Sequence, residues 1–329
     1  MMNKQLFKII LLVVATIGVI LLLDTQVARR YFEAHKPLSD GDKMKPAGLL
    51  ILGDIMLDRS IRQRGVDKGY LDIFACVKDI LLAQSAVLAN LEGPITDYKS
   101  TSLGSKPGAP DNYQFTFDPA VTDALLLSNI GTVSIGNNHI LNFGSDGLAQ
   151  TKKYLERAGI KYFGDSYYDN DDTKRSVDIV MPDRVVTAVN YNKFCCTPTD
   201  SQDLQKQNVI ELVVSAKEEG KYVLVYTHWG TEYATTSNRV QRELAHAFID
   251  AGADLVIGSH PHVVQEREEY RGRVIYYSLG NFVFDQWFSD DVKKGLGVRL
   301  EFKPGESKPE IVEIPLVLSK QYIVCPAII

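Results

Sequence analysis

The chain has 329 residues, of which 45% are hydrophobic and 23% are charged, a composition typical of globular proteins. Its formal net charge is −5, which gives no basic excess of the kind that nucleic-acid-binding proteins carry, so we expect no nucleic-acid partner. Four cysteines in so long a chain exclude a disulfide-rich scaffold, and none belongs to a Cys-x-x-Cys pair. We expect Cys76 to lie in the core, the adjacent Cys195 and Cys196 not to pair with each other, and Cys325 to lie in the C-terminal tail.

The N-terminus carries fifteen uncharged, mostly apolar residues, 9–23. As a helix this run spans roughly 22 Å, and counting from Leu6 brings it nearer to the bilayer core of about 30 Å. A cleaved signal peptide would have a similar apolar core, but no Ala-x-Ala cleavage site follows. We therefore favour an uncleaved, single-pass membrane anchor over residues 1–28 and a polar linker over residues 29–47. A globular domain behind one such anchor favours a place at the cell membrane, facing away from the cytoplasm.

After the linker, short apolar runs typical of strands alternate with amphipathic helical segments. The expected strands are residues 49–52, 86–89, 132–135, 185–189, 222–226, 255–257, 274–277 and 282–284. The expected helices are residues 71–84, 119–128, 145–158, 203–219 and 239–251. This alternation predicts an α/β protein whose buried sheet is covered by helices on both faces. The helix-poor stretch from 274 to about 318 predicts antiparallel strands at one edge, and residues 100–112 predict a long surface loop that borders a site.

Polar side chains follow most of these strands, at the end where open α/β sheets bind their ligands. These residues are Asp54, Asn90, Glu92, Asn137, Asn138, His139, His228, Glu232, His260, His262 and Asn281. Each has an ordinary alternative: Asp54 could cap a helix, His228 could be a packed core histidine, and Asn281 is most simply a turn residue. Four of the six histidines nevertheless fall in these segments. Together they predict a metal centre with carboxylate, amide and imidazole ligands.

The pair His260 and His262 is the strongest part of this pattern. In an extended backbone, residues two apart point to the same side, and Pro261 biases the residue before it toward extended conformations. Two imidazoles would then point at one metal ion. Taken alone, the same pair could equally be a polar turn.

The mixture of carboxylate, amide and imidazole groups favours manganese, iron or zinc, as one ion or as a pair. Two-metal centres hold their ions about 3.5–4 Å apart and stabilise both the attacking and the leaving oxygen of a displacement. Hydrolysis of a phosphate ester would suit this geometry. His139 is then the candidate general acid, or the residue that stabilises charge in the transition state.

Six segments, residues 53–57, 90–92, 137–139, 228–233, 258–262 and 277–282, resemble in order the motifs of the CapA family. These are membrane-anchored bacterial proteins associated with synthesis of the capsule polymer poly-γ-glutamate. The resemblance runs from about residue 48 to 285. It implies a four-layer α/β/β/α sandwich similar to calcineurin-like metallophosphoesterases, over residues 48–318, with residues 319–329 as a tail.

The resemblance also implies roles for individual residues. The implied metal ligands are Asp54, Glu92, Asn138, His228, His260 and His262, with His139 as the catalytic residue beside them. The residues implied to contact substrate or support the ligands are Asn90, Asn137, Glu232 and Asn281.

Three positions depart from the motifs of the superfamily. Met56 stands where an Asp-x-His motif has its histidine, Glu92 closes a segment that usually carries a bridging aspartate, and Asn142 stands where an aspartate is usual. A single ion and an altered pair are both compatible with these changes.

Three functions are compatible with these motifs. The first is a membrane-anchored component of poly-γ-glutamate synthesis or export that works with other capsule-synthesis membrane proteins. The second is an autonomous metal-dependent hydrolase of a phosphoester or an amide-linked polymer, and the third is a non-catalytic metal-binding scaffold. An anionic polymer would need a local basic surface or the metal itself on so acidic a chain, and the sequence alone does not locate that surface.

Overall fold

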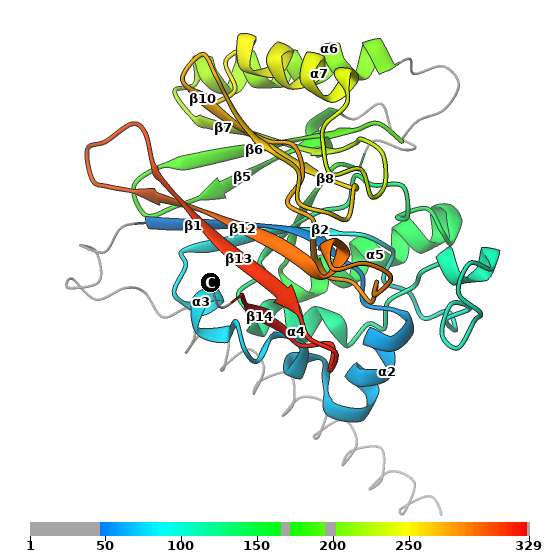
Figure 1. Cartoon of the computed structure of the whole chain (residues 1–329). Coiled ribbons are helices and arrows are strands. Elements are labelled where there is room, and N and C mark those ends of the chain that lie inside the picture. Colours follow the sequence, from blue (N-terminus) through cyan, green and yellow to red (C-terminus); the bar gives the residue numbers. More distant parts are fainter. Residues whose placement is uncertain (1–46, 166–171, 195–201, 328–329) are drawn as a thin grey trace, which may run out of the picture. The chain divides into compact units, whose positions relative to one another are not determined.

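The computed structural model of the protein describes residues 47–165, 172–194 and 202–327 (Figure 1). The predicted anchor, all but the last residue of the predicted linker, and the pair Cys195 and Cys196 lie outside these residues. Within the described ranges, no helix combines the length and the apolar character needed to cross a membrane.

The larger of two sheets has the strand order β14-β13-β12-β1-β2-β3-β4, with β11 also paired to β1. Its strands are β1 (Ala47–Ile55), β2 (Ala86–Leu91), β3 (Thr132–Ser134), β4 (Lys161–Phe163), β11 (Asn281–Val283), β12 (Lys294–Phe302), β13 (Glu310–Leu318) and β14 (Val324–Pro326). The run from β1 to β4 is parallel, whereas β12, β13 and β14 are antiparallel. The antiparallel edge expected over residues 274–318 is confirmed for β12 and β13, whereas β11, from the same stretch, pairs in parallel with β1.

The smaller sheet has the order β5-β6-β7-β8-β10-β9. Its strands are β5 (Ser176–Val180), β6 (Val185–Asn192), β7 (Tyr222–His228), β8 (Leu255–Ser259), β9 (Arg267–Tyr270) and β10 (Arg273–Tyr276). Strands β6, β7, β8 and β10 run parallel, and the outer strands β5 and β9 pair antiparallel to their neighbours.

The two sheets pack face to face around one apolar core. Leu49, Ile51 and Leu88 enter it from the larger sheet, and Leu224 and Ile257 enter it from the smaller. These strands are nearly continuous apolar runs because helices bury their other faces as well. The mixed α/β class expected from the sequence is confirmed.

Helices flank the sheets on both outer sides (Figure 1). Helices α6 (Gln202–Glu218) and α7 (Arg239–Asp250) pack on the smaller sheet through a second apolar cluster, while α2 (Arg59–Lys68), α3 (Lys78–Leu82) and α4 (Val121–Leu127) lie beside the larger sheet. Helix α5 (Gly144–Ala158) connects β3 to β4. The short 3-10 helices are η2 (Tyr70–Phe74), η3 (Pro110–Tyr113), η4 (Asp172–Arg175) and η5 (Asp291–Lys293).

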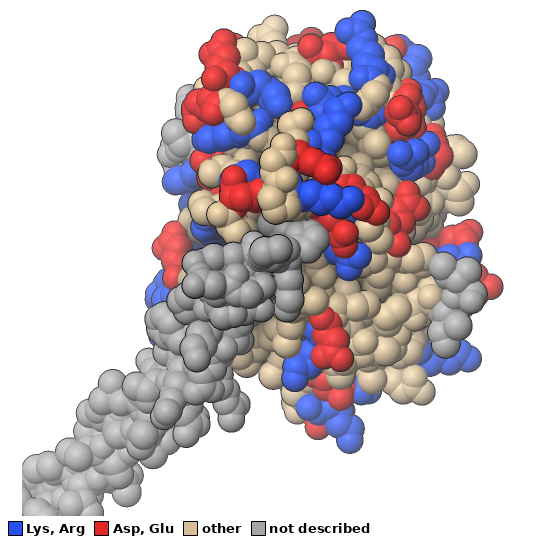
Figure 2. Space-filling model, turned by 90° about the vertical axis from the view of Figure 1, so that its left-hand side faces the viewer, with Lys and Arg blue, Asp and Glu red and all other residues tan. Residues whose placement is uncertain are grey.

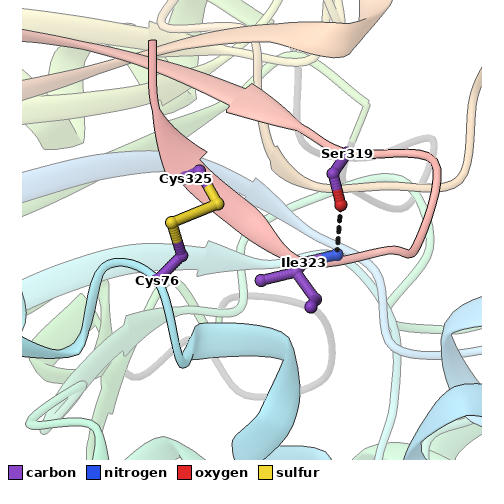
Figure 3. Close-up of a disulfide and its surroundings, with 4 residues drawn as sticks. All are labelled: Cys76, Ser319, Ile323 and Cys325. Carbon is purple, nitrogen blue, oxygen red and sulfur yellow. Dashed lines mark hydrogen bonds between the residues drawn. A yellow bond between two sulfur atoms is a disulfide. The ribbon is translucent and has the colours of Figure 1, made fainter. Parts of the chain in front are cut away.

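The structure differs from the sequence expectation around Cys76. The helix predicted over residues 71–84 is broken into η2 and α3, and Cys76 lies exposed in the break instead of in the core. It forms a disulfide with Cys325, 249 positions away (Figure 3). Cys325 belongs to β14, so the predicted tail over residues 319–329 contains a strand of the larger sheet. A bond between such distant residues leaves no local sequence pattern.

The strand ends that carry polar residues meet at one edge of the sandwich. Asp54 is paired in register with Asn90 of β2 and with Asn281 of β11. The last residue of β7, His228, is paired in register with the last residue of β8, Ser259. Gly53 makes the approach of β11 possible, because an added Cβ there would lie 1.9 Å from the carbonyl oxygen of Gly280.

Candidate metal centre

The carboxylate of Glu92 lies at the middle of the polar cluster. Glu92 follows β2 directly and is fully buried. Its Oε1 atom is 3.6 Å from Nε2 of His262 and 4.0 Å from Nε2 of both His139 and His228. Among the residues that the structure describes, no hydrogen-bond donor reaches this oxygen. A buried oxygen without a donor is costly unless a cation or a proton satisfies it.

The hydrogen bonds of two histidines fix which of their nitrogen atoms carries the proton. Nδ1 of His262 is 3.0 Å from Oδ1 of Asn281, whose amide nitrogen donates to the carbonyl oxygen of Val292. Nδ1 of His139 is 3.1 Å from Oδ1 of Asn142, which also accepts the backbone N–H of Phe115. Since an amide oxygen only accepts, both Nδ1 atoms are the donors. The Nε2 atom of each ring is therefore the nitrogen that faces Glu92.

His228 also presents Nε2 to Glu92. Its Nδ1 lies 2.9 Å from the hydroxyl of Ser259, which donates to the carbonyl oxygen of Thr227, and 3.4 Å from the amide nitrogen of Asn90. Its Nε2 lies 2.8 Å from Oδ1 of Asn138. The imidazole nitrogens and the carboxylate and amide oxygens gathered around Glu92 thus fit a metal ion.

Burial sets the protonation states in this cluster. It lowers the pKa of His228 well below its ordinary value, and it lowers the pKa of His139 to about 4 and that of His260 to about 3. Burial, together with the nearby charge of Asp54, raises the pKa of Glu92 well above its usual range. Neutral imidazoles are the form that binds metal, and a cation would offset the cost of an ionised Glu92.

His260 and His262 converge by a route different from the one the sequence suggested. Their φ angles are 94° and 59°, so neither residue is extended, and the bias that Pro261 exerts is overridden. Their rings lie 5.9 Å apart, and Nδ1 of His260 is buried without a hydrogen-bond partner in the described part of the chain. Positive φ at two non-glycine residues is strain of the kind found at functional sites.

Asp54, Asn90 and Asn137 tie the strand ends together. The amide nitrogen of Asn90 donates to Asp54 at 2.8 Å, and that of Asn137 donates to the side-chain oxygen of Asn90 at 3.1 Å. The backbone N–H of His260 donates to the other oxygen of Asp54 at 3.1 Å. Buried hydrogen bonds therefore join the ends of β1, β2, β3 and β8.

Within the described residues, three groups of side chains have ligand atoms that lie within 4.8 Å of one another. Two are buried, Asp54 with Glu92 and His262, and Glu92 with His228 and His260. The third combines His260 and His262 with the exposed Glu232. The cluster therefore offers donors for one ion or for two.

Comparison with known proteins identifies the family. Residues 48–286 match the model of the bacterial capsule synthesis protein PGA_cap family. The chain belongs to this family. It is 32% identical over 243 residues to the PGA biosynthesis protein CapA of Bacillus subtilis (strain 168), covering 71% of the chain and 62% of that relative. It is 29% identical over 299 residues to the capsule biosynthesis protein CapA of Bacillus anthracis, covering 86% of the chain and 70% of that relative.

This chain spans about three fifths of the length of the Bacillus subtilis relative. Among solved structures, a novel phosphatase from Mycoplasma pneumoniae superposes with a TM-score of 0.51 at 13% identity, over 85% of this chain and 96% of the phosphatase. This similarity shows that the two proteins share a fold.

Met56 stands at the position where an Asp-x-His motif has its histidine. Its side chain is fully buried, and its sulfur accepts the backbone N–H of Asp58 at 3.1 Å. The carboxylate of Asp58 binds Arg62 and the hydroxyl of Ser102, which fixes the start of α2. The thioether therefore supports the backbone beside the centre.

Arg59 is a residue of the site that the sequence analysis missed. Its guanidinium lies 5.1 Å from the ring of Phe115 and 5.4 Å from that of Phe284, and it pairs with Asp285 at 2.5 Å. Phe115 stacks near His139 at 4.4 Å, and Phe284 contacts His262 at 4.7 Å. The only sequence signal was its position just after the first motif.

Proposed function

We propose that the protein acts in the synthesis or export of poly-γ-glutamate as a membrane-anchored, extracytoplasmic protein with a metal centre at Glu92. The family match and the two Bacillus relatives support the pathway. The observation that carries the metal centre is the buried Oε1 of Glu92, which three histidine Nε2 atoms face and no described donor reaches.

Two features support a place outside the cytoplasm. The disulfide between Cys76 and Cys325 belongs to an oxidising compartment, because cytosolic reductants keep thiols reduced. The apolar run over residues 9–23, flanked by charged residues, supports an N-terminal anchor. Together they favour a globular domain on the outer side of the cell membrane.

The ligands of the centre would be Asp54, Glu92, Asn138, His228, His260 and His262. A divalent ion bound there would polarise a carbonyl or phosphoryl oxygen and lower the pKa of bound water. Because burial lowers the pKa of His139 and Asn142 holds its Nδ1 proton, Nε2 would accept a proton from a reacting group, so we propose a base here in place of the general acid that the sequence suggested. Elemental analysis of the purified protein distinguishes manganese, iron and zinc.

The test compares Glu92→Gln with Glu243→Gln, a matched change on the exposed face of α7. The full-length protein is purified in detergent, its metal content is measured by elemental analysis, and each variant is returned to a polymer-producing strain that lacks the gene. We expect Glu92→Gln to lose the bound metal and polymer production, and Glu243→Gln to keep both. A wild-type protein without divalent metal, or full production by Glu92→Gln, would contradict the proposal.

The second candidate function, an autonomous hydrolase, is favoured by the free Nε2 of His139 beside the centre. It is tested with a phosphodiester and with poly-γ-glutamate of defined length as substrates. We expect His139→Ala to retain metal and lose turnover. Turnover that survives both His139→Ala and His260→Ala would rule out this site, and metal binding without turnover by the wild type would favour a scaffold.

A further inference from the structure

A large groove opens beside the metal centre. Its volume is about 1090 Å³, at the upper limit of the roughly 300–1,000 Å³ usual for small-molecule pockets. Four segments and Tyr233 line it: the segments are α2, the stretch 102–113, residues 285–288, and residues 320–322 in the turn between β13 and β14. Figure 1 shows α2 and this turn on the same side of the larger sheet. The groove is large enough for several units of an extended polymer.

One end of the groove reaches the histidine cluster. Tyr233 lines the groove, its ring is 6.0 Å from that of His262, and its backbone N–H donates to Pro261 at 2.8 Å. Arg59, also in the lining, stacks against the phenylalanine rings that contact His139 and His262. The groove therefore ends at residues that pack directly against the histidine cluster.

The lining is cationic in an otherwise acidic protein. It contains Arg59, Arg64, Lys68 and Lys320, against the acids Asp67 and Asp285. On the face that Figure 2 presents, by contrast, Lys and Arg are interspersed with Asp and Glu. Basic residues therefore outnumber acidic residues in the lining of the groove.

Two of these cations are available to a ligand. Arg59 is paired with Asp285, and Arg64 is paired with Asp72. Lys68 and Lys320 are exposed, and neither has an ion pair with any residue in the described ranges. Since a helix rises about 1.5 Å per residue, Lys68 lies roughly 13 Å along α2 from Arg59. Lys68 therefore belongs to the part of the groove away from the centre.

Exposed aromatic rings complete the lining. Tyr113 is 49% exposed, Tyr233 39% and Phe288 65%, and the rings of Tyr233 and Phe288 pack edge to face 4.8 Å apart. Aromatic faces suit methylene groups, and lysines suit carboxylates. A polyamide with a methylene-rich backbone and a carboxylate on every unit offers both.

We propose that this groove binds a segment of poly-γ-glutamate, with its carboxylates at Lys68 and Lys320 and its backbone along the aromatic rings, and leads it to the metal centre. The choice of polymer rests on the proposed function. The groove, its charge and its connection to the centre rest on the structure alone.

The test measures the affinity of the full-length protein in detergent for fluorescent poly-γ-glutamate oligomers by anisotropy, at low and moderate salt. The test variant is Lys68→Glu/Lys320→Glu. The control is Lys153→Glu/Lys308→Glu, which makes the same charge change at exposed lysines outside the groove. We expect the test variant to bind about tenfold more weakly and with a smaller salt dependence, and the control to stay within about twofold.

Further measurements separate the possible outcomes. The neutral double variant Lys68→Gln/Lys320→Gln should show an intermediate loss, and thermal unfolding checks that each variant is folded. No polymer binding by the wild type, or an equal loss in test and control variants, overturns the groove. If the wild type binds metal and supports polymer production while the test variant keeps full affinity, only the groove proposal fails. Polymer binding that depends on both lysines in a protein without metal supports the groove and overturns the metal centre.

Discussion

At the scale of single residues, the candidate centre is organised by the groups behind its ligands. Asn281, Asn142 and Ser259 lie 2.9 to 3.1 Å from Nδ1 of His262, His139 and His228, and Nε2 of each of these rings faces Glu92. Such outer partners fix the tautomer and the orientation of metal-binding histidines. The donor atoms are therefore arranged before any ion binds, and the partners can be tested separately from the ligands.

The first prediction concerns Asn281. Asn281→Ala removes the acceptor for Nδ1 of His262 and should lower metal affinity about 10–100-fold, whereas Asn281→Asp keeps an oxygen there and should lose less. Competition with a chelator of known affinity measures both. Equal affinities for the two variants would show that the orientation of His262 does not depend on this oxygen.

The second prediction concerns the stability of the metal-free protein. In Glu92→Gln an uncharged amide replaces a buried carboxyl group and offers donors to the surrounding lone pairs, so the variant should be about 1–3 kcal/mol more stable to urea in the presence of a chelator. Added metal should stabilise the wild type and not the variant. A variant less stable than wild type under chelation would contradict this explanation of the site.

At the scale of elements, the local sequence pattern predicted the strands that carry the site. The eight expected runs coincide with strands because each is short, apolar and followed by a polar turn. The break at Cys76 and the strand β14 depend on a partner far along the chain, so no local period reveals them. The residues of the cluster were found through their positions at strand ends.

The convergence of His260 and His262 was predicted from an extended backbone, which the structure does not have at these residues. Alternation along a strand would have aimed both rings the same way, but the backbone turns through positive φ at each residue. Tertiary contacts impose this turn, including the bond from the backbone of His260 to Asp54. Arg59 was missed because its neighbours Phe115, Phe284 and Asp285 come from distant segments.

The third prediction tests the close packing at the end of β8. An added Cβ at Gly258 would lie 1.9 Å from the carbonyl oxygen of Tyr277, whereas at Gly131 it would meet no atom within 4 Å. Gly258→Ala should therefore destabilise the fold by about 1–3 kcal/mol, and Gly131→Ala should change its stability little. Urea unfolding of both variants measures the difference, and equal stabilities would show that β8 and the chain after β10 can move apart.

At the scale of the whole molecule, one covalent bond joins distant parts of the larger sheet and its helices. The disulfide links Cys76, between η2 and α3, to Cys325 on β14 (Figure 3). The turn before β14 is closed by two bonds between Ser319 and Ile323, of 2.9 and 3.2 Å. The bond therefore anchors the last strand and the turn that precedes it.

The fourth prediction concerns this bond. Cys325→Ser should lower the free energy of unfolding by about 2–4 kcal/mol under non-reducing conditions, and so should Cys76→Ser. Because either change removes the same bond, the double variant should be no less stable than the single variants. Additive losses would show that the two cysteines contribute separately, and a reductant should destabilise only the wild type.

The groove is built from both ends of the described sequence: one wall comes from α2, at residues 59–68, and another comes from residues 320–322. A ribosome releases these walls more than 250 residues apart. No chain truncated before residue 320 can present the complete groove, even if its first strands have already paired. Polymer capture should therefore begin only after residues 320–322 have been synthesised and β14 is seated, so ligand binding would report that both walls of the groove have come together.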